Sequence, residues 1–346
     1  MGHPSSDLAR RPDAPAIKAG VRTYWQRMYT ALARTGLLAP KQAWRAAFAR
    51  LWSFGSHKQE PPPSELAPDR VVYGLSQPLF GLRMLLSDPE LLREALVPAA
   101  WLGAFCAVVA TLSFSSDGGG AWAWVKAFYK TFAVLAPVPS VIFAKHYARL
   151  AALVRWRLGF GACGPRELPI SVSLKRAIQQ AIIVAIGVLP FALVGVFFLR
   201  LVVLVWGMHW VVVDAFDDAR VLMPGETIRS AEAADREAPP PWYVRWFLHA
   251  ADRLPVIGRP LRAFARLCDR LSMPWREEIH LMESNPHIAL GFALSTATLL
   301  ATPVLNLLFR PIILVGSSHL LGHLESSEPA QHPQLPAAAL RPQLPA

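Results

Sequence analysis

Residues 302–316, TPVLNLLFRPIILVG, decide how this chain is interpreted, because they are apolar almost throughout yet include two prolines, an asparagine and an arginine. In a bilayer, prolines and polar side chains are tolerated only where other groups satisfy the backbone that they free. An arginine in an apolar run is costly and therefore needs a partner or a function. The segment predicts a membrane protein with a broken or re-entrant helix.

The composition of the whole chain supports this interpretation. Of its 346 residues, 53% are hydrophobic and only 17% are charged, whereas soluble domains average about 25% charged residues. The formal net charge of +11 fits positive-inside topology and attraction to anionic lipid. No nucleic-acid-binding motif accompanies the basic residues. The expected partners therefore include membrane lipids and exclude nucleic acid.

Two apolar stretches predict long transmembrane helices, at about residues 95–114, with Pro98 in the first turn, and at about residues 121–144. About 20 apolar residues suffice to cross a bilayer. The glycine-rich turn between them lacks Lys and Arg, whereas basic residues precede the first stretch and follow the second. The positive-inside rule then places the N-terminus and residues 145–176 in the cytoplasm.

Two further apolar regions are each broken by proline. Residues 177–213 contain Pro190 and Arg200, and residues 287–321 contain Pro303, Arg310 and Pro311. Each is roughly 35 residues long, which fits either two tight crossings or a re-entrant hairpin of two short helices. The predicted fold is therefore an all-α integral membrane protein with two long transmembrane helices and two proline-broken hairpins, re-entrant or fully crossing.

The remaining segments are expected outside the bilayer. Residues 1–71 form a basic amphipathic cytoplasmic region, which either lies on an anionic membrane or packs on the protein's own cytoplasmic face. A cytoplasmic insertion at about 219–272 holds a second amphipathic group, and residues 326–346 are a Pro-rich tail expected to be disordered. The apolar residues that define these amphipathic patterns are Ile17, Val21, Trp25, Met28, Leu32, Trp44, Phe48, Leu51, Trp242, Trp246, Leu261, Phe264, Leu267 and Leu271.

The sequence contains no Ser/His/Asp set, P-loop or dinucleotide fingerprint, so neither an enzyme nor a cofactor is expected. The three cysteines match no metal or redox spacing. His319 and His323 are four residues apart but lack a third ligand, so they are interpreted as two interfacial histidines and no metal site is predicted. Asp214, Asp217 and Asp218 follow an apolar span; solvated charges at a helix end are favoured over a proton or cation site.

Arg200 and Arg310 are the most unusual residues, because each lies in the second half of a proline-broken apolar region. A guanidinium stays charged and binds tetrahedral oxyanions through two hydrogen bonds. Broken helices also present N-terminal N–H groups that favour anions. Arg200 and Arg310 are thus candidate anion-binding residues. The alternative is that they snorkel toward lipid headgroups or pair with another part of the protein.

The pattern Pro303-x-x-Asn306-x-x-x-x-Pro311-x-x-x-x-Gly316 resembles the closing motif of the bacterial CysZ-type sulfate transporters, whose domain is shared with the eukaryotic etoposide-induced membrane proteins. The entry to the first span, DPELLR at residues 88–93 followed by Pro98, resembles the approach of that family to its first long helix. The resemblance covers residues 72–325, a CysZ-like membrane domain. It gives structural roles to Pro89, Pro98, Pro303, Asn306, Pro311 and Gly316.

The resemblance implies a multi-pass protein of the bacterial inner membrane, with both termini cytoplasmic, two long transmembrane helices and two membrane-dipping hairpins. In the family, a Gly-Leu/Ile-Arg-Arg string after the proline that corresponds to Pro89 contributes to sulfate binding. Here Glu90 and Leu92 replace the glycine and the first arginine, so only Arg93 matches. The expected function is transport of a small anion, with sulfate as a candidate, and a homo-oligomer as one candidate assembly. The alternative is a membrane scaffold that does not transport.

Overall fold

The computed structural model describes residues 35–327 except for residues 38, 56–59, 64–65, 118–119, 136–141, 162, 189–195, 254–256 and 301–305. This part of the chain is mostly helical, as the sequence predicts. Its strands are β1 (Gly164–Pro165) and β2 (Val221–Leu222), which pair antiparallel. The amphipathic helix expected between residues 17 and 32, Pro190, Pro303 and the tail after residue 327 lie outside the described residues.

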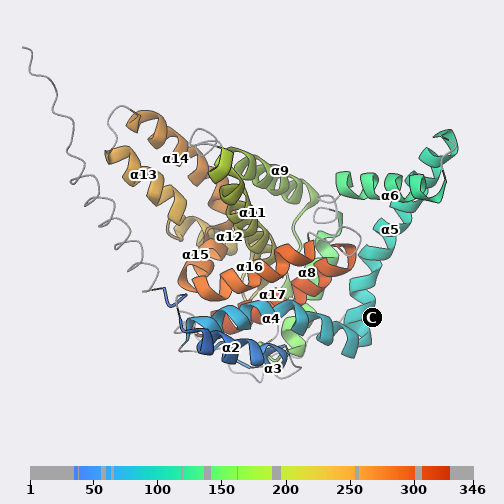
Figure 1. Ribbon diagram of the computed structural model, residues 1–346, viewed down its shortest axis with the longest axis horizontal. Coiled ribbons are helices and arrows are strands. Elements are labelled where there is room, and N and C mark those ends of the chain that lie inside the picture. Colours follow the sequence, from blue (N-terminus) through green and yellow to red (C-terminus); the bar gives the residue numbers. More distant parts are fainter. Residues whose placement is uncertain are drawn as a thin grey trace, which may run out of the picture.

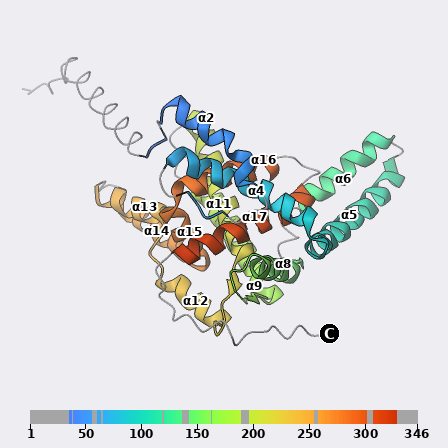
Figure 2. The same cartoon turned by 90° about the horizontal axis from the view of Figure 1, so that it is seen from below.

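The described helices follow one another along the chain with short connections (Figures 1 and 2). In chain order they are α2 (Lys41–Ala49), α3 (Leu51–Phe54), α4 (Ala67–Ser87), α5 (Pro89–Asp117), α6 (Ala121–Leu135), α8 (Ala144–Arg157), α9 (Ile170–Gly187), α11 (Val196–Ala219), α12 (Ile228–Glu237), α13 (Trp242–Arg253), α14 (Gly258–Ser272), the 3-10 helix η1 (Met273–Trp275), α15 (Arg276–Ser284), α16 (Pro286–Leu300) and α17 (Asn306–Ser327).

Three of the described helices are long and apolar enough to cross a membrane: Pro89–Leu112 in α5, Ile170–Gly187 in α9 and Leu199–Ala219 in α11. Much of their apolar surface faces outward, including Trp101 on α5 and Leu204 on α11. Large exposed apolar surfaces of this kind mark contact with a membrane or a partner. The structure therefore supports the expectation of a membrane protein.

The first expected span is longer than the sequence indicated. Its helix, α5, begins at Pro89, and the Asp88 carboxylate caps it by accepting from the backbone N–H groups of Glu90 at 3.0 Å and Leu91 at 3.3 Å. The prediction that Pro98 lies in the first turn is wrong, because the capped helix starts nine residues earlier and Pro98 is inside it. In the second expected span, residues 121–135 form α6, residues 136–141 lie outside the described residues, and α8 begins at residue 144.

The hairpin of α5 and α6 projects away from the other helices in both views (Figures 1 and 2). The two helices pack against each other, and the Trp124 indole N–H donates to the Thr111 hydroxyl at 3.1 Å. The hairpin has a small hydrophobic cluster of its own, in which Cys106 and Leu102 are buried. Cys106 is therefore a packing residue.

Helix α4 is largely buried, and no helix was expected there from the sequence. It packs against α16 and α17 and crosses the predicted domain boundary at residue 72. Glycines allow the close approach: a Cβ at Gly291 of α16 would lie 1.9 Å from the Val71 carbonyl oxygen, and one at Gly316 of α17 would lie 2.6 Å from that of Gln77. Small residues are what permit helix backbones to meet this closely.

In the part of each proline-broken region that the structure describes there are two helices, as predicted. Helices α9 and α11 flank residues 189–195, and α16 and α17 flank residues 301–305. The first pair extends beyond the predicted residues 177–213, since it begins at Ile170 and ends at Ala219. Pro311 is buried inside α17. The predicted insertion folds into β2, α12, α13 and α14. Of the apolar residues that define its amphipathic pattern, Leu261, Phe264 and Leu271 are half-buried, whereas Trp242, Trp246 and Leu267 are exposed.

Candidate functional site

A pocket of about 60 Å³ opens at the end of α11, between α8, α9 and the turn that carries β1. The three aspartates of α11 are spaced three and four residues apart, so that they share one side of the helix. The polar residues that line the pocket are Arg166, Ser173, Arg176, Gln180, Asp214, Asp217, Asp218, Arg220 and Trp275. A space of this size accommodates a small ion or a few water molecules.

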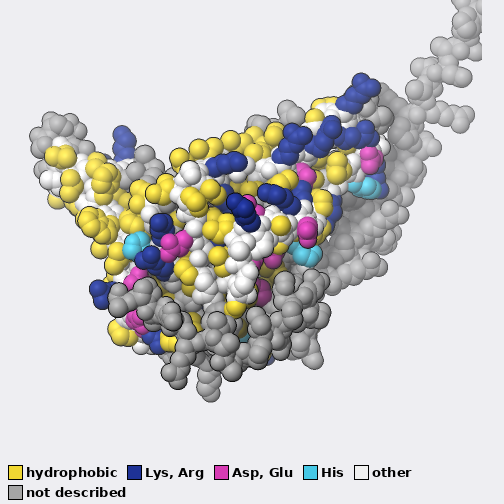
Figure 3. All heavy atoms as spheres, turned by 180° about the vertical axis from the view of Figure 1, so that it is seen from behind, with side chains coloured by type: hydrophobic (Ala, Val, Ile, Leu, Met, Phe, Trp, Pro, Cys, Tyr) yellow, Lys and Arg dark blue, Asp and Glu magenta, His cyan; other side chains and the backbone are white. Residues whose placement is uncertain are grey.

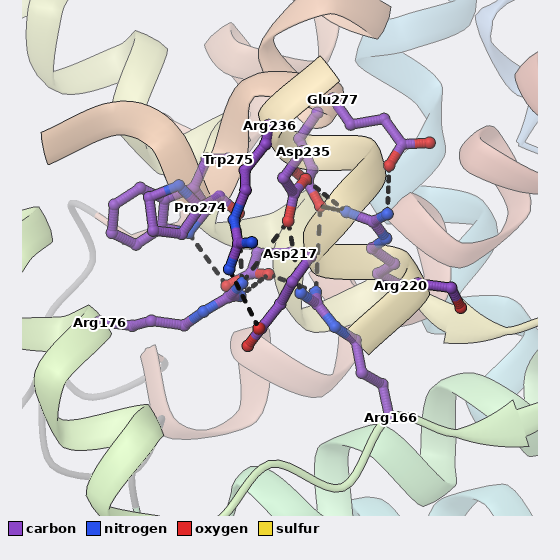
Figure 4. A network of polar contacts seen from close by, with 12 residues as sticks. Arg166, Arg176, Asp217, Arg220, Asp235, Arg236, Pro274, Trp275 and Glu277 are labelled. Atoms are coloured by element: carbon purple, nitrogen blue, oxygen red, sulfur yellow. Dashed lines mark hydrogen bonds and ion pairs between the residues drawn. The ribbon is translucent and has the colours of Figure 1, made fainter. Parts of the chain in front are cut away.

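Asp217 is the centre of the arrangement (Figure 4). Its Oδ1 accepts hydrogen bonds from Nη1 of Arg166 and Nη1 of Arg176, both at 2.7 Å, and its Oδ2 accepts from Nε1 of Trp275 at 3.0 Å. Both arginine side chains are almost fully buried. Two guanidinium groups from different elements therefore converge on one carboxylate of α11, with the indole fixing its orientation.

Arg220 forms a second centre beside the first (Figure 4). Its Nη1 donates to Asp235 Oδ1 and to Glu278 Oε1, both at 2.9 Å, and its Nη2 donates to Glu277. Burial and the neighbouring Glu278 carboxylate raise the pKa of Asp235 to about 7, against the effect of Arg220. Burial opposes the charge of Arg220, but Glu278 and Asp235 together raise its pKa above the usual value. This centre ties α12 and α15 to the end of α11.

Arg310 of α17 finds its partners on α11. Its Nη2 donates to Asp218 Oδ2 at 2.7 Å and to Asp214 Oδ2 at 3.1 Å, and its guanidinium lies 5.5 Å from the centre of the Tyr147 ring. The protein itself thus supplies the anion that compensates Arg310. Asp214, Asp217 and Asp218 lie at the end of α11, as expected, but the expectation that they are simply solvated is wrong. Each is paired with an arginine from the β1 turn, α9 or α17.

Arg93 and Arg200 do not belong to this arrangement. Both are exposed, on α5 and α11 respectively, and within the described residues neither makes an ion pair. Of the three arginines predicted to bind an anion, only Arg310 lies next to the pocket-lining residues. Its role toward an external anion stays a prediction, since two carboxylates already occupy its Nη2.

The arginines that line the pocket are Arg166, Arg176 and Arg220. Arg166 and Arg176 were expected only as basic residues of the cytoplasmic segment 145–176. Local sequence offers no signal for Arg166, because it follows a turn that only the tertiary fold brings to α11. Among the residues lining the pocket, the buried polar side-chain atoms without a hydrogen-bond partner are Arg166 Nε, Arg166 Nη2 and Ser173 Oγ. All three can donate a hydrogen bond. The pocket therefore has donors without a hydrogen bond. One of them, Arg166 Nη2, lies 4.0 Å from Oδ2 of Asp235, which is itself a buried atom without a hydrogen-bond partner.

The histidine pair lies elsewhere, between α17 and α4. His319 is buried; its Nδ1 is 2.8 Å from Gln77 Oε1 and its Nε2 is 3.2 Å from Nε2 of His323. The interpretation of His319 as interfacial is wrong, because α17 is a core helix. Within the described residues no group of three His, Cys, Asp or Glu side chains could hold a metal ion.

Comparison of the chain with known protein families, with curated proteins and with solved structures finds no match. The case for a function therefore rests on the geometry of the pocket and on the residues that carry the resemblance.

Proposed function

We propose that this chain is an integral membrane protein that transports a small inorganic anion, with sulfate as the first candidate. In this proposal the chain has the architecture of the CysZ-type transporters, whose closing motif its C-terminal pattern resembles, and α9–α11 and α16–α17 are the two hairpins. It lies in a bacterial inner membrane with both termini in the cytoplasm. The three apolar helices long enough to cross a bilayer support the membrane part of the proposal.

The observation that carries the anion part is the set of unused donors in the pocket. Arg166 offers Nε and Nη2, and Ser173 offers its hydroxyl, in a buried setting where each unpaired polar group costs free energy. An oxyanion accepts from such groups through strong charge-assisted bonds. The ligand-binding arginines in this proposal are Arg166 and Arg176, in place of Arg93 and Arg200.

Asp217 has a defined part in this proposal. It accepts from both arginines and so acts as an internal anion when no substrate is bound. A bound oxyanion shares the two guanidinium groups with Asp217, or replaces it as their partner. Because the occupied and empty states then compete for the same donors, binding is weak enough for the anion to leave, as transport requires.

Sulfate is expected to raise the melting temperature of the purified wild-type protein, because a ligand that binds only the folded state stabilises it by mass action, by about 2.7 kcal/mol at one hundred times the dissociation constant. Arg166→Gln should abolish this response. Arg200→Gln is the control, since Arg200 is exposed and distant from the pocket lining. The measurement is thermal unfolding in detergent, with sulfate compared against chloride at equal ionic strength.

Loss of the sulfate response in Arg166→Gln but not in Arg200→Gln supports the proposed site. An equal response in wild type and Arg166→Gln contradicts it. Uptake of labelled sulfate by proteoliposomes then separates transport from binding alone.

A membrane scaffold that does not transport is the second candidate function. Charge compensation favours it. Arg166, Arg176 and Arg220 share carboxylate partners, and Arg310 pairs with two other aspartates of α11, so these ion pairs could serve stability alone. A wild-type protein that neither responds to oxyanions nor takes them up into proteoliposomes, while remaining folded, would support the scaffold.

A further inference from the structure

The hairpin of α13 and α14 has a packed inner face. The rings of Phe247 and Phe264 meet edge to face with their centroids 4.9 Å apart. At the loop end, a Cβ on Gly258 would lie 2.5 Å from the Ala251 carbonyl oxygen, so the two helices approach closely there. The buried apolar side chains of both helices are thus used within the hairpin and against α11, where Tyr243 contacts Trp206.

The outer face of α14 carries a stripe of arginines. Arg259, Arg262, Arg266 and Arg270 recur at intervals of three and four residues, so they share one side of the helix, and all four are exposed. Arg262 pairs with Asp252 at 2.9 Å. Within the described residues the other three form no ion pair. This surface therefore presents positive charge that the protein does not compensate.

Exposed apolar side chains lie beside the arginine stripe. Leu267 is 46% exposed on α14, Ile257 is 47% exposed at its start, and Trp246 is 50% exposed on α13. Figure 3 shows Lys and Arg side chains gathered at the end of the molecule that α13 and α14 form, next to hydrophobic side chains. Basic residues flanked by Trp and Leu are the pattern of helices that lie in a membrane interface.

The position of the hairpin fits the same partner. Helix α14 packs against α9, one of the three helices long and apolar enough to cross a bilayer. Helix α9 itself exposes Ile170, Leu174 and Ile178. The arginine stripe is therefore part of an element that directly adjoins a surface suited to lipid.

We propose that α13–α14 is a platform that binds the surface of an anionic bilayer, with the arginine stripe on lipid phosphates and Leu267 and Trp246 inserted between headgroups. The charge of the stripe selects anionic over neutral lipid, and the apolar residues beside it favour a bilayer over a purely polar polyanion. This inference rests on the membrane association of the chain and is independent of anion transport.

The test uses the full chain in nanodiscs of phosphatidylcholine with a graded fraction of phosphatidylglycerol. An environment-sensitive fluorophore is placed at Ala263→Cys, an exposed position of α14, in a Cys163→Ser background because Cys106 and Cys268 are buried. The emission should shift to the blue as the anionic fraction rises, and the shift should weaken at high salt, since charge at a surface is screened.

The decisive comparison is between two double variants that remove the same charge. Each basic residue near an anionic surface contributes about fivefold to lipid affinity, so Arg266→Gln with Arg270→Gln should weaken the phosphatidylglycerol dependence about 25-fold. Arg229→Gln with Arg236→Gln, on α12, is the matched control and should change it little, because both arginines are exposed outside the platform.

Three results would overturn the proposal: an emission that does not respond to phosphatidylglycerol, an equal shift in pure phosphatidylcholine, or equal losses in the two double variants. A response to a soluble polyanion such as heparin that matches the response to anionic nanodiscs would also contradict it, since the stripe would then recognise charge without a bilayer. The sulfate response of the pocket variants does not bear on any of these outcomes.

Discussion

Replacing Glu325 with alanine is expected to lower the free energy of unfolding by about 3–5 kcal/mol, because it leaves a buried arginine without its counter-charge. The Arg155 side chain is fully buried, and it donates to Glu325 through Nη1 at 2.6 Å and Nη2 at 3.1 Å. This two-bond pair joins α8 to the end of α17. Chemical denaturation of the purified protein in detergent micelles would measure the loss.

Glu167→Ala is the matched control. The Glu167 and Glu325 side chains are both 31% exposed, and each pairs with one arginine of α8. The partner of Glu167, Arg149, is itself 59% exposed. Loss of such a surface pair costs about 0–1 kcal/mol. Equal destabilisation by the two substitutions would show that the burial of Arg155 does not determine the importance of its partner.

Gly291→Ala is expected to destabilise the protein by about 3 kcal/mol, the upper part of the range for overpacking. The added Cβ would lie 1.9 Å from the Val71 carbonyl oxygen and 2.9 Å from the Leu75 nitrogen. Both atoms belong to the backbone of α4, which cannot turn aside as a side chain can. Helices α4 and α16 must therefore separate, and their shared core loses contact.

The control for this prediction is Gly103→Ala in α5. A Cβ at Gly103 would meet no atom within 4 Å. There the substitution should raise stability by about 0.5–1 kcal/mol, since glycine is a poor residue for a helix interior. If both glycine substitutions stabilise the protein, the close approach of α4 and α16 is not as the structure has it.

Much of the helical layout could be predicted from local properties of the sequence. The apolar run that begins near residue 95 and the glycine-rich stretch after it indicate a long helix, which the structure has as α5, and the prolines at 190 and 303 predict the separation of α9 from α11 and of α16 from α17. These signals follow from the length needed to cross a bilayer and from the backbone N–H that proline lacks. Helix α4 was not predicted, because Arg70, Pro78 and Arg83 interrupt its apolar pattern.

The candidate site was only partly accessible to the same reasoning. Asp214, Asp217 and Asp218 stand out after an apolar span, and Arg310 stands out inside one, but sequence does not show that they meet. Their pairing depends on α17 lying against α11, across 92 residues of chain between Arg310 and Asp218. Arg166 and Arg176, which pair with Asp217, come from a turn and from α9, where basic residues are equally expected from topology alone.

The sequence by itself determined that the chain is largely helical, apolar enough for a membrane, positively charged and broken by proline at two places, because each of these properties depends on neighbouring residues. Only the tertiary structure decided that α4 packs against α16 and α17, that Asp217 joins Arg166 to Arg176, and that Arg310 is compensated from within. These outcomes depend on which helices approach one another. That approach is set by glycines that let helix backbones meet closely and by the free-energy cost of leaving a buried charge unpaired.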